Sequence, residues 1–274
     1  MNSNFVCICG NNNFSRVFVY TVPPKEEVRF ESVQYDNYYR EILKCDLCGH
    51  FISTHQMDLK SIYTGDYVAS NYKGVEGIHE NFKRIISLDP VESDNIGRTA
   101  RINGFARKHF SKDVEGRTLL DIGSGLGVFP HVMKQSGWVC TALDPDANAV
   151  EHLDKFVKVR TVQGDFSKKI DLYVFDVVTL NKVLEHVKDP LRLLSRVRDN
   201  VKPDGFVYVE VPDCEAAVNE GREREEFFID HLHVFSAASL SLLVSKSGLE
   251  LKYMERFHEP SSKYTLCAFM VTKL

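Results

Sequence analysis

A glycine-rich loop at residues 121–127 ends the short apolar run that begins at Thr118. Its glycines are Gly123, Gly125 and Gly127. Glycine lets the backbone approach a ligand closely, and the start of the helix expected after the loop offers N–H groups to an anion. A dinucleotide fingerprint needs its third glycine three positions after the second, but here Gly127 follows Gly125 by two. The loop therefore predicts a ligand site without specifying the ligand.

Acidic residues stand at the ends of three successive expected strands. Asp121 precedes the first glycine, and Asp144 ends the second strand 21 residues after Gly123. A carboxylate at that distance can accept both hydroxyls of a ribose. Asp165 ends the third strand, where it can take an adenine amino group while Phe166 packs on the ring. Each acid alone fits a loop residue or a helix cap, but three at one edge of a sheet indicate a common ligand.

Four of the seven cysteines fall in the first fifth of the chain, and they are Cys7, Cys9, Cys45 and Cys48. A glycine after each pair suits a sharp turn at which backbone N–H groups face thiolate sulfur, and four thiolates satisfy tetrahedral Zn²⁺. The first pair has a one-residue spacer, so His50 or His55 is an alternative ligand, and unmetallated thiols are the other interpretation. We expect structural zinc, because four cysteines leave no open coordination position.

Strand and helix patterns alternate from residue 117 onward. The expected strands are residues 118–123, 139–143, 157–162, 172–180 and 206–211, and the expected helices are residues 128–136, 147–156, 191–201 and 236–247. Two closing strands, residues 249–257 and 264–272, follow without a helix between them. The predicted fold class is α/β, a Rossmann-like doubly wound parallel sheet with an antiparallel C-terminal edge hairpin.

The chain divides into three expected parts. Residues 1–58 form a small zinc-ribbon-like module with short strands at residues 14–20 and 51–54. Residues 59–116 form a helical linker or cover with two apolar stripes at helical spacing, which are Ile78, Phe82, Ile85 and Ile86, then Ile102, Phe105, Ala106 and Phe110. Residues 117–274 form the α/β domain.

Four motifs of the α/β domain resemble the class I S-adenosylmethionine-dependent methyltransferases. They are the 121–127 loop, Asp144, the Gly-Asp-Phe at residues 164–166, and residues 181–186 followed by Asp189-Pro190. The resemblance implies that Asp121 and the loop lie beside the methionine part of the cofactor, that Asp144 holds the ribose, and that Asp165 and Phe166 hold the adenine. The implied cofactor-binding residues are Asp121, Gly123, Ser124, Gly125, Gly127, Asp144, Pro145, Asp165, Phe166 and Asn181.

The fusion of a cysteine module to this domain resembles a bacterial group that methylates nucleotide-linked sugars, including zinc-containing sugar C-methyltransferases. The stretches that carry this resemblance are Asp66-Tyr67, Glu185-His186 and residues 227–236. The carbon-methylating enzymes have a large extra carboxy-terminal domain, whereas this sequence stops at Leu274. They also have tyrosine and glutamate where this chain has Phe228 and Asp230. We therefore expect methylation of a hydroxyl of a nucleotide-linked sugar, with carbon methylation as the alternative.

The acceptor segment supplies the candidate catalytic residues. A sugar hydroxyl is a poor nucleophile at neutral pH and needs a general base within hydrogen-bond reach. We expect His231 as that base, oriented by Asp230, with His186 and Tyr67 lining the same pocket and His186 as the alternative base. A structural role is the other interpretation, because His233 shares the face of His231 on an extended segment. A catalytic metal is not expected, since no dense Asp/His cluster stands near this segment.

Composition limits the remaining function classes. The 274 residues include 34 Lys+Arg and 38 Asp+Glu, and the net charge of −4 argues against nucleic-acid binding and hence against an RNA methyltransferase. A catalytically dead binding module is a second rival, but it predicts a broken cofactor loop, and the glycines are in place. No apolar run approaches 18 residues and the N-terminus lacks signal-peptide features, so we expect a cytoplasmic protein that does not bind membranes.

Overall fold

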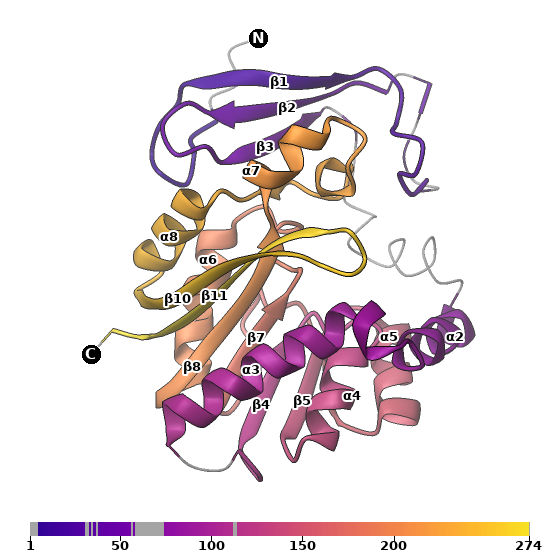
Figure 1. Cartoon of the computed structure of the whole chain (residues 1–274), viewed down its shortest axis with the longest axis vertical. Helices are drawn as coiled ribbons and strands as arrows, with labels where there is room; N and C mark the ends of the chain where they lie inside the picture. Colours follow the sequence, from indigo (N-terminus) through magenta and orange to yellow (C-terminus); the bar gives the residue numbers. More distant parts are fainter. Residues whose placement is uncertain are drawn as a thin grey trace.

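The computed structural model describes residues 5–30, 33, 35–36, 38–55, 57, 74–111 and 114–273. Its larger sheet has seven strands in the order β10-β11-β8-β7-β4-β5-β6. These are β4 Thr118–Ile122, β5 Val139–Asp144, β6 Arg160–Gln163, β7 Phe175–Asn181, β8 Val201–Pro212, β10 Leu249–His258 and β11 Tyr264–Thr272. β4 to β8 pair in parallel, and the β10–β11 hairpin pairs antiparallel with β8 (Figure 1). The predicted fold class is confirmed.

Both faces of this sheet are covered by apolar layers, as the continuous apolar run of the central strand predicts. In β7, Val178 and Leu180 belong to one layer and Val177 to the other. The first layer contains α6 (Pro190–Val197) and α8 (Ala237–Lys246), and the second contains α3 (Asp94–Phe110) and α4 (Val128–Gln135). Figure 1 shows α3 crossing one face of the sheet, with α2 (Gly74–Ile86) and α5 (Ala147–His152) at one side.

Helix ends follow capping residues in the sequence. Ser236 caps α8, because its Oγ accepts a hydrogen bond from the Ser239 N–H while the Ser239 Oγ accepts one from the Ser236 N–H. Asp189 caps α6 through its side chain, which accepts a hydrogen bond from the Arg192 N–H. The third parallel strand begins at Arg160, later than predicted, because residues 153–157 extend α5 as a π-helical turn. Short 3₁₀ helices lie at Pro90–Glu92, Arg198–Asn200, Val218–Glu220 and Glu225–Phe227.

A second, antiparallel sheet lies at the N-terminal end of the molecule (Figure 1). Its strands, in order, are β1 (Phe14–Tyr20), β2 (Arg40–Cys45), β3 (Phe51–His55) and β9 (His233–Val234). The sequence predicts β1 and β3 but neither β2 nor β9. β9 comes from the α/β part of the chain and pairs with β3, so the small sheet contains strands from both predicted domains.

The core of the small sheet also contains residues from both parts of the chain. Tyr20, Ile42 and Phe51 pack with Phe227 and Ile229, all of them buried. The short helix α7 (Cys214–Ala217) joins the same cluster. Among the described residues, no helix is both long and apolar enough to cross a membrane.

Candidate active site

The glycine-rich loop leaves β4, which lies between β5 and β7 at the point where the direction of strand succession reverses. In open α/β sheets, ligands bind at such a point, outside the carboxyl ends of the strands. Gly123 has φ 72° and a Cβ there would lie 2.7 Å from Val183 Cγ2. A Cβ on Gly127 would lie 2.6 Å from Leu153 Cδ2. A Cβ on Gly125 would meet nothing within 4 Å. The loop is therefore packed closely against neighbouring side chains at Gly123 and Gly127, and there is open space beside Gly125.

Asp121 ends β4 with a buried and hydrogen-bonded carboxylate, only 2% exposed. Its Oδ1 accepts hydrogen bonds from Thr179 Oγ1 at 2.7 Å and from Asn181 Nδ2 at 2.9 Å. Burial raises the pKa of Asp121 to about 6, against these hydrogen bonds, which favour the ionised form. The predicted neighbours Asp121 and Asn181 are therefore in direct contact.

A cavity of about 390 Å³ lies beside this loop. Its lining includes Asp121, Gly123, Ser124, Gly127 and Asn181 from the predicted cofactor site, together with Asn95 and Arg98 from α3. The Oδ1 atoms of Asn95 and Asn181 are buried, and no residue in the described part of the chain donates a hydrogen bond to them. Two orphaned amide oxygens beside a carboxylate are suited to a ligand that donates several hydrogen bonds, such as an ammonium group.

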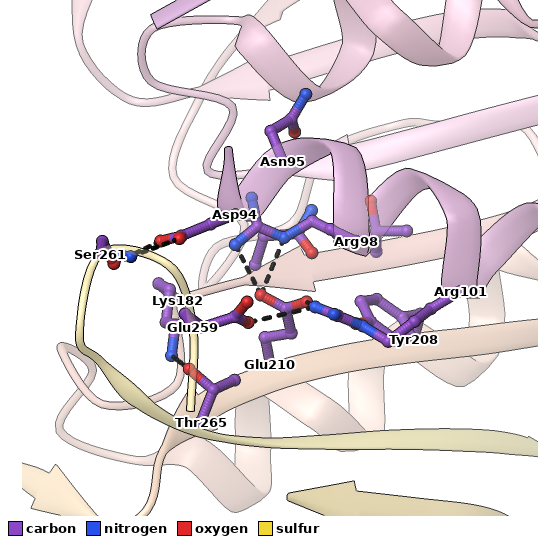
Figure 2. Close-up of polar contacts among 12 residues, drawn as sticks. Asp94, Asn95, Arg98, Arg101, Lys182, Tyr208, Glu210, Glu259, Ser261 and Thr265 are labelled. Atoms are coloured by element: carbon purple, nitrogen blue, oxygen red, sulfur yellow. Dashed lines mark hydrogen bonds and ion pairs between the residues drawn. The ribbon is translucent and has the colours of Figure 1, made fainter. Parts of the chain in front are cut away.

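Arg98 and Arg101 attach α3 to the sheet through a buried charge network (Figure 2). Arg98 donates from Nε and Nη2 to Glu210 Oε2, at 2.8 and 2.6 Å, and Arg101 Nη2 donates to Glu210 Oε1 at 2.8 Å. Burial opposes ionisation of Glu210, but the two guanidinium groups overcome it and lower the pKa of Glu210 to about 2. Asp94 and Ser261 connect the start of α3 to the β10–β11 loop. Helix α3, which forms one wall of the cavity, is thus attached to both the sheet and the β10–β11 hairpin.

Asn95 and Arg98 were not predicted as site residues. They stand three positions apart, which places them on one side of α3. The available signal was that Asn95 and Arg98 precede Ile102 at spacings of 3 and 4, so they continue its apolar stripe with polar residues, and a polar face turned towards the sheet needs partners or a ligand. Sequence reasoning used only the apolar positions of this helix.

The other predicted cofactor residues lie at the ends of the next two strands. Asp144 is 7% exposed, and its two oxygens accept hydrogen bonds from the N–H groups of Gly125 (2.8 Å) and Asp146 (2.9 Å). Burial raises the pKa of Asp144 to about 6. Pro145 beside it is exposed, and Asp165 is half-exposed. Phe166 is a core residue, 5% exposed, and its packing on an adenine ring stays a prediction.

The structure brings together three residues of the predicted acceptor region. One ligand atom from each of Glu185, His186 and His231 lies within 4.8 Å of the others. The Nδ1 of His186 is 2.9 Å from the carbonyl oxygen of Asp230, and the Nδ1 of His231 is 3.0 Å from the carbonyl oxygen of Glu226. The Oδ2 of Asp230 lies 3.7 Å from His186 Nδ1. The expectation that this region lacks a dense carboxylate and histidine cluster is therefore wrong, because residues 45 positions apart meet.

Backbone hydrogen bonds attach this histidine cluster to the segment that leaves β7. The carbonyl oxygen of Glu185 accepts from the N–H groups of Leu232 and His233, at 2.8 and 3.1 Å. Asn181, four residues before Glu185, lines the cavity, whereas Glu185, His186 and His231 are not among its described lining residues. Tyr67, the remaining predicted catalytic residue, lies outside the described residues.

The four N-terminal cysteines form a single cluster. Their sulfurs lie within 4.8 Å of one another, with Cys7 Sγ 3.4 Å from Cys48 Sγ and Cys9 Sγ 3.6 Å from Cys45 Sγ. Neither predicted substitute ligand belongs to this described cluster. His50 is hydrogen-bonded to His233 and Ser239, and His55 to the carbonyl oxygen of Met57.

Comparison with protein families identifies the family to which the chain belongs. The family model described as a methyltransferase domain matches residues 98–253, more than half of the chain. The chain belongs to this methyltransferase family. The prediction of a methyltransferase is thereby confirmed, and the match begins at Arg98, within the helix that supplies the unpredicted cavity residues.

Curated relatives of this methyltransferase include ubiquinone biosynthesis O-methyltransferases. The one from Erwinia tasmaniensis is 30% identical over 161 residues, which is 56% of this chain and 60% of that relative. The one from Histophilus somni is 30% identical over 139 residues, or 47% of this chain and 54% of the relative. The matched region thus spans less than two thirds of these relatives.

Solved structures with the same fold are also methyltransferases. The magnesium protoporphyrin IX methyltransferase from Synechocystis PCC 6803, with S-adenosylhomocysteine bound, has a TM-score of 0.56 at 12% identity and covers 76% of this chain and 99% of that one. A 1,6-didemethyltoxoflavin N1-methyltransferase from Burkholderia thailandensis has a TM-score of 0.54 at 16% identity, covering 88% and 100%. At these identities the likeness is one of fold.

Proposed function

We propose that this methyltransferase transfers the methyl group of S-adenosylmethionine to a hydroxyl oxygen of a small molecule. The observation that carries the proposal is the set of unsatisfied acceptors in the cavity, the Oδ1 atoms of Asn95 and Asn181, beside the Asp121 carboxylate. These groups suit the ammonium of the cofactor's amino acid, and the Arg98 guanidinium in the same wall suits its carboxylate. When bound, the cofactor supplies a methyl group that is already activated on a sulfonium.

The chain's own residues position that cofactor along the strand ends. Asp144, already oriented by two backbone N–H groups, accepts hydrogen bonds from the ribose hydroxyls. Asp165 accepts one from the adenine amino group, while Gly125 leaves room for close approach of the ligand. The loop glycines and the first turn of α4 supply backbone polarity at the same edge of the sheet.

Proton removal from the acceptor takes place at the histidine cluster in this proposal. A hydrogen bond from Nδ1–H to the Glu226 carbonyl fixes the tautomer of His231, so its Nε2 carries the lone pair that a general base needs. His186 is oriented in the same way by the Asp230 carbonyl and is the alternative base. The Oδ2 of Asp230 lies 3.7 Å from His186 Nδ1, and in this proposal Asp230 orients His186.

The acceptor in this proposal is a hydroxyl of a nucleotide-linked sugar or another carbohydrate, with methylation of a sugar carbon as the alternative. The names of the curated relatives support transfer to oxygen, since they are O-methyltransferases. The division into residues 1–58, 59–116 and 117–274 stays a prediction, and so does the cytoplasmic location.

A structural zinc ion at the four cysteines is part of the proposal. A tetrahedral Zn²⁺ with Zn–S bonds of about 2.3 Å separates its sulfurs by about 3.8 Å. The two close S–S pairs, at 3.4 and 3.6 Å, are near that value. The backbone N–H of Asn11 also donates to Cys9 Sγ at 3.4 Å, as expected of a thiolate ligand.

The experiment that tests the proposed reaction is incubation with methyl-labelled S-adenosylmethionine and a panel of nucleotide-linked sugars and small hydroxylated aromatics. Mass spectrometry detects the added methyl group and NMR locates it. We expect the label on an oxygen. Label found only on carbon would favour the alternative reaction, and label only on nitrogen would contradict both.

A further inference from the structure

We propose that Glu185, His186 and His231 bind one divalent transition-metal cation, distinct from any zinc at the four cysteines. Two imidazoles and one carboxylate with ligand atoms within 4.8 Å of one another form the donor set that such cations prefer. The inference rests on the proposed function in one respect only: the role given to the cation, activation of the acceptor hydroxyl, requires that the enzyme methylate a hydroxyl.

The burial of the Glu185 carboxylate is the first observation in favour of a bound cation. The side chain is fully buried, and neither of its oxygens has a hydrogen-bond partner among the described residues. An ionised carboxylate removed from water without a partner is strongly disfavoured, whereas a bound cation satisfies both its charge and its lone pairs. The structure places this carboxylate beside two imidazoles.

The orientation of the histidines is the second observation. Each Nδ1 lies within 3.0 Å of a backbone carbonyl oxygen, which only accepts hydrogen bonds, so each Nδ1 carries the proton. Nε2 is then the ring nitrogen with the lone pair. Metal-binding histidines are typically held in this manner, with the other ring N–H on a carbonyl or carboxylate.

The site also has an approach from solvent and open coordination positions. His186 and His231 are partly exposed, whereas Glu185 is buried behind them. Three protein ligands leave positions for an oxygen of the acceptor. A cation there lowers the pKa of the acceptor hydroxyl, whose proton passes to solvent. The oxygen then forms the bond to the methyl carbon as the methyl–sulfur bond breaks and its electron pair stays on sulfur. In the cation-bound enzyme His231 acts as a ligand, and the cation replaces the histidine base.

Metal content tests this proposal. The whole chain is dialysed to equilibrium at micromolar free Zn²⁺, and bound zinc per chain is counted for the wild type, Glu185→Gln, His231→Asn and the control His258→Asn, whose histidine ends β10 and belongs to neither cluster. We expect two zinc ions per chain in the wild type and in His258→Asn, and one in Glu185→Gln and in His231→Asn. Circular dichroism establishes that the variants are folded, and Glu185→Gln keeps the shape of the buried side chain.

The result that would overturn the proposal is the same zinc count in the wild type and Glu185→Gln, whether one ion or two. Calorimetry with S-adenosylmethionine on the same samples separates this inference from the proposed function. Cofactor binding with no loss of zinc in the variants would defeat only the cation site. The expected zinc counts without cofactor binding would defeat only the proposed methyl transfer.

Discussion

Glu27 Oε2 accepts a hydrogen bond from the backbone N–H of Ile229 at 2.7 Å, and the same oxygen is 3.0 Å from Arg40 Nη2. Glu27 and Arg40 are both buried in the N-terminal part of the chain. Ile229 stands two residues before His231 in the proposed acceptor segment. The N-terminal sheet therefore holds the segment that carries the candidate base, in addition to carrying the cysteine cluster.

The first prediction concerns this buried ion pair. Arg40→Ala leaves the Glu27 carboxylate buried without its cationic partner, which should lower the free energy of unfolding by about 3–5 kcal/mol. Urea denaturation measures the change. The matched control is Arg16→Ala, because Arg16 pairs with Glu41 at the exposed surface, where water screens the pair and its loss should change the free energy of unfolding far less. Equal losses in the two variants would contradict the structural role given to Glu27 and Arg40.

The second prediction concerns Arg98. Arg98→Lys removes the two-donor contact with Glu210 and the planar group that faces the cavity, so S-adenosylmethionine should bind about tenfold more weakly, in line with a charge-assisted hydrogen bond worth about 1.5–3 kcal/mol. Calorimetry measures the affinity. Arg107→Lys, an exposed position on the same helix, is the control. Unchanged affinity in Arg98→Lys would remove Arg98 from the cofactor site.

The third prediction concerns the pH dependence of cofactor binding. Burial raises the pKa of Asp121 and of Asp144 to about 6. Ligand hydroxyl and ammonium donors need the ionised carboxylates, so affinity should fall as the pH drops from 7 to 5, with proton release on binding near pH 6. Calorimetry in buffers of different ionisation enthalpy measures that release. A flat affinity profile over this range would argue against contact with either carboxylate.

The same two carboxyl groups have an opposite effect on the stability of the ligand-free protein. Their folded-state pKa values lie above the ordinary 3.8. The stabilisation that they contribute is therefore fully present below pH 3.8 and is lost as the pH rises through about 6. An asparagine side chain does not ionise, so Asp144→Asn should lose less stability than the wild type as the pH rises. The difference in free energy of unfolding, variant minus wild type, should therefore increase between pH 5 and pH 7.

The fourth prediction concerns the cysteine cluster. Cys45→Ser should lose one bound zinc ion and destabilise the N-terminal sheet, because metal binding at such a site contributes to folding. Cys140→Ala, a buried cysteine of the main core, is the control and should keep its zinc. Metal analysis and thermal unfolding measure the two effects. The same number of zinc ions in Cys45→Ser and the wild type would show that the four sulfurs are not a metal site.

Local patterns in the sequence predict most of the fold and the part of the cavity wall formed by the loop after β4. The glycine loop and Asp144 can be predicted because strand, turn and acid follow one another directly in the chain. Asn95 and Arg98 are missed because the direction of a helix face depends on packing against the sheet. The contacts of Glu27 with Ile229 and of Glu185 with His231 join residues far apart in the sequence. No spacing rule connects such residues, so only the folded chain shows them.

The most direct measurement for the central claim is calorimetric titration of S-adenosylmethionine into the wild type and into Asn181→Ala. We expect one site per chain in the wild type, with binding weakened at least tenfold in the variant because the amide oxygen of Asn181 and its hydrogen bond to Asp121 are both lost. Absence of binding to the wild type at millimolar S-adenosylmethionine would contradict the proposed cofactor site.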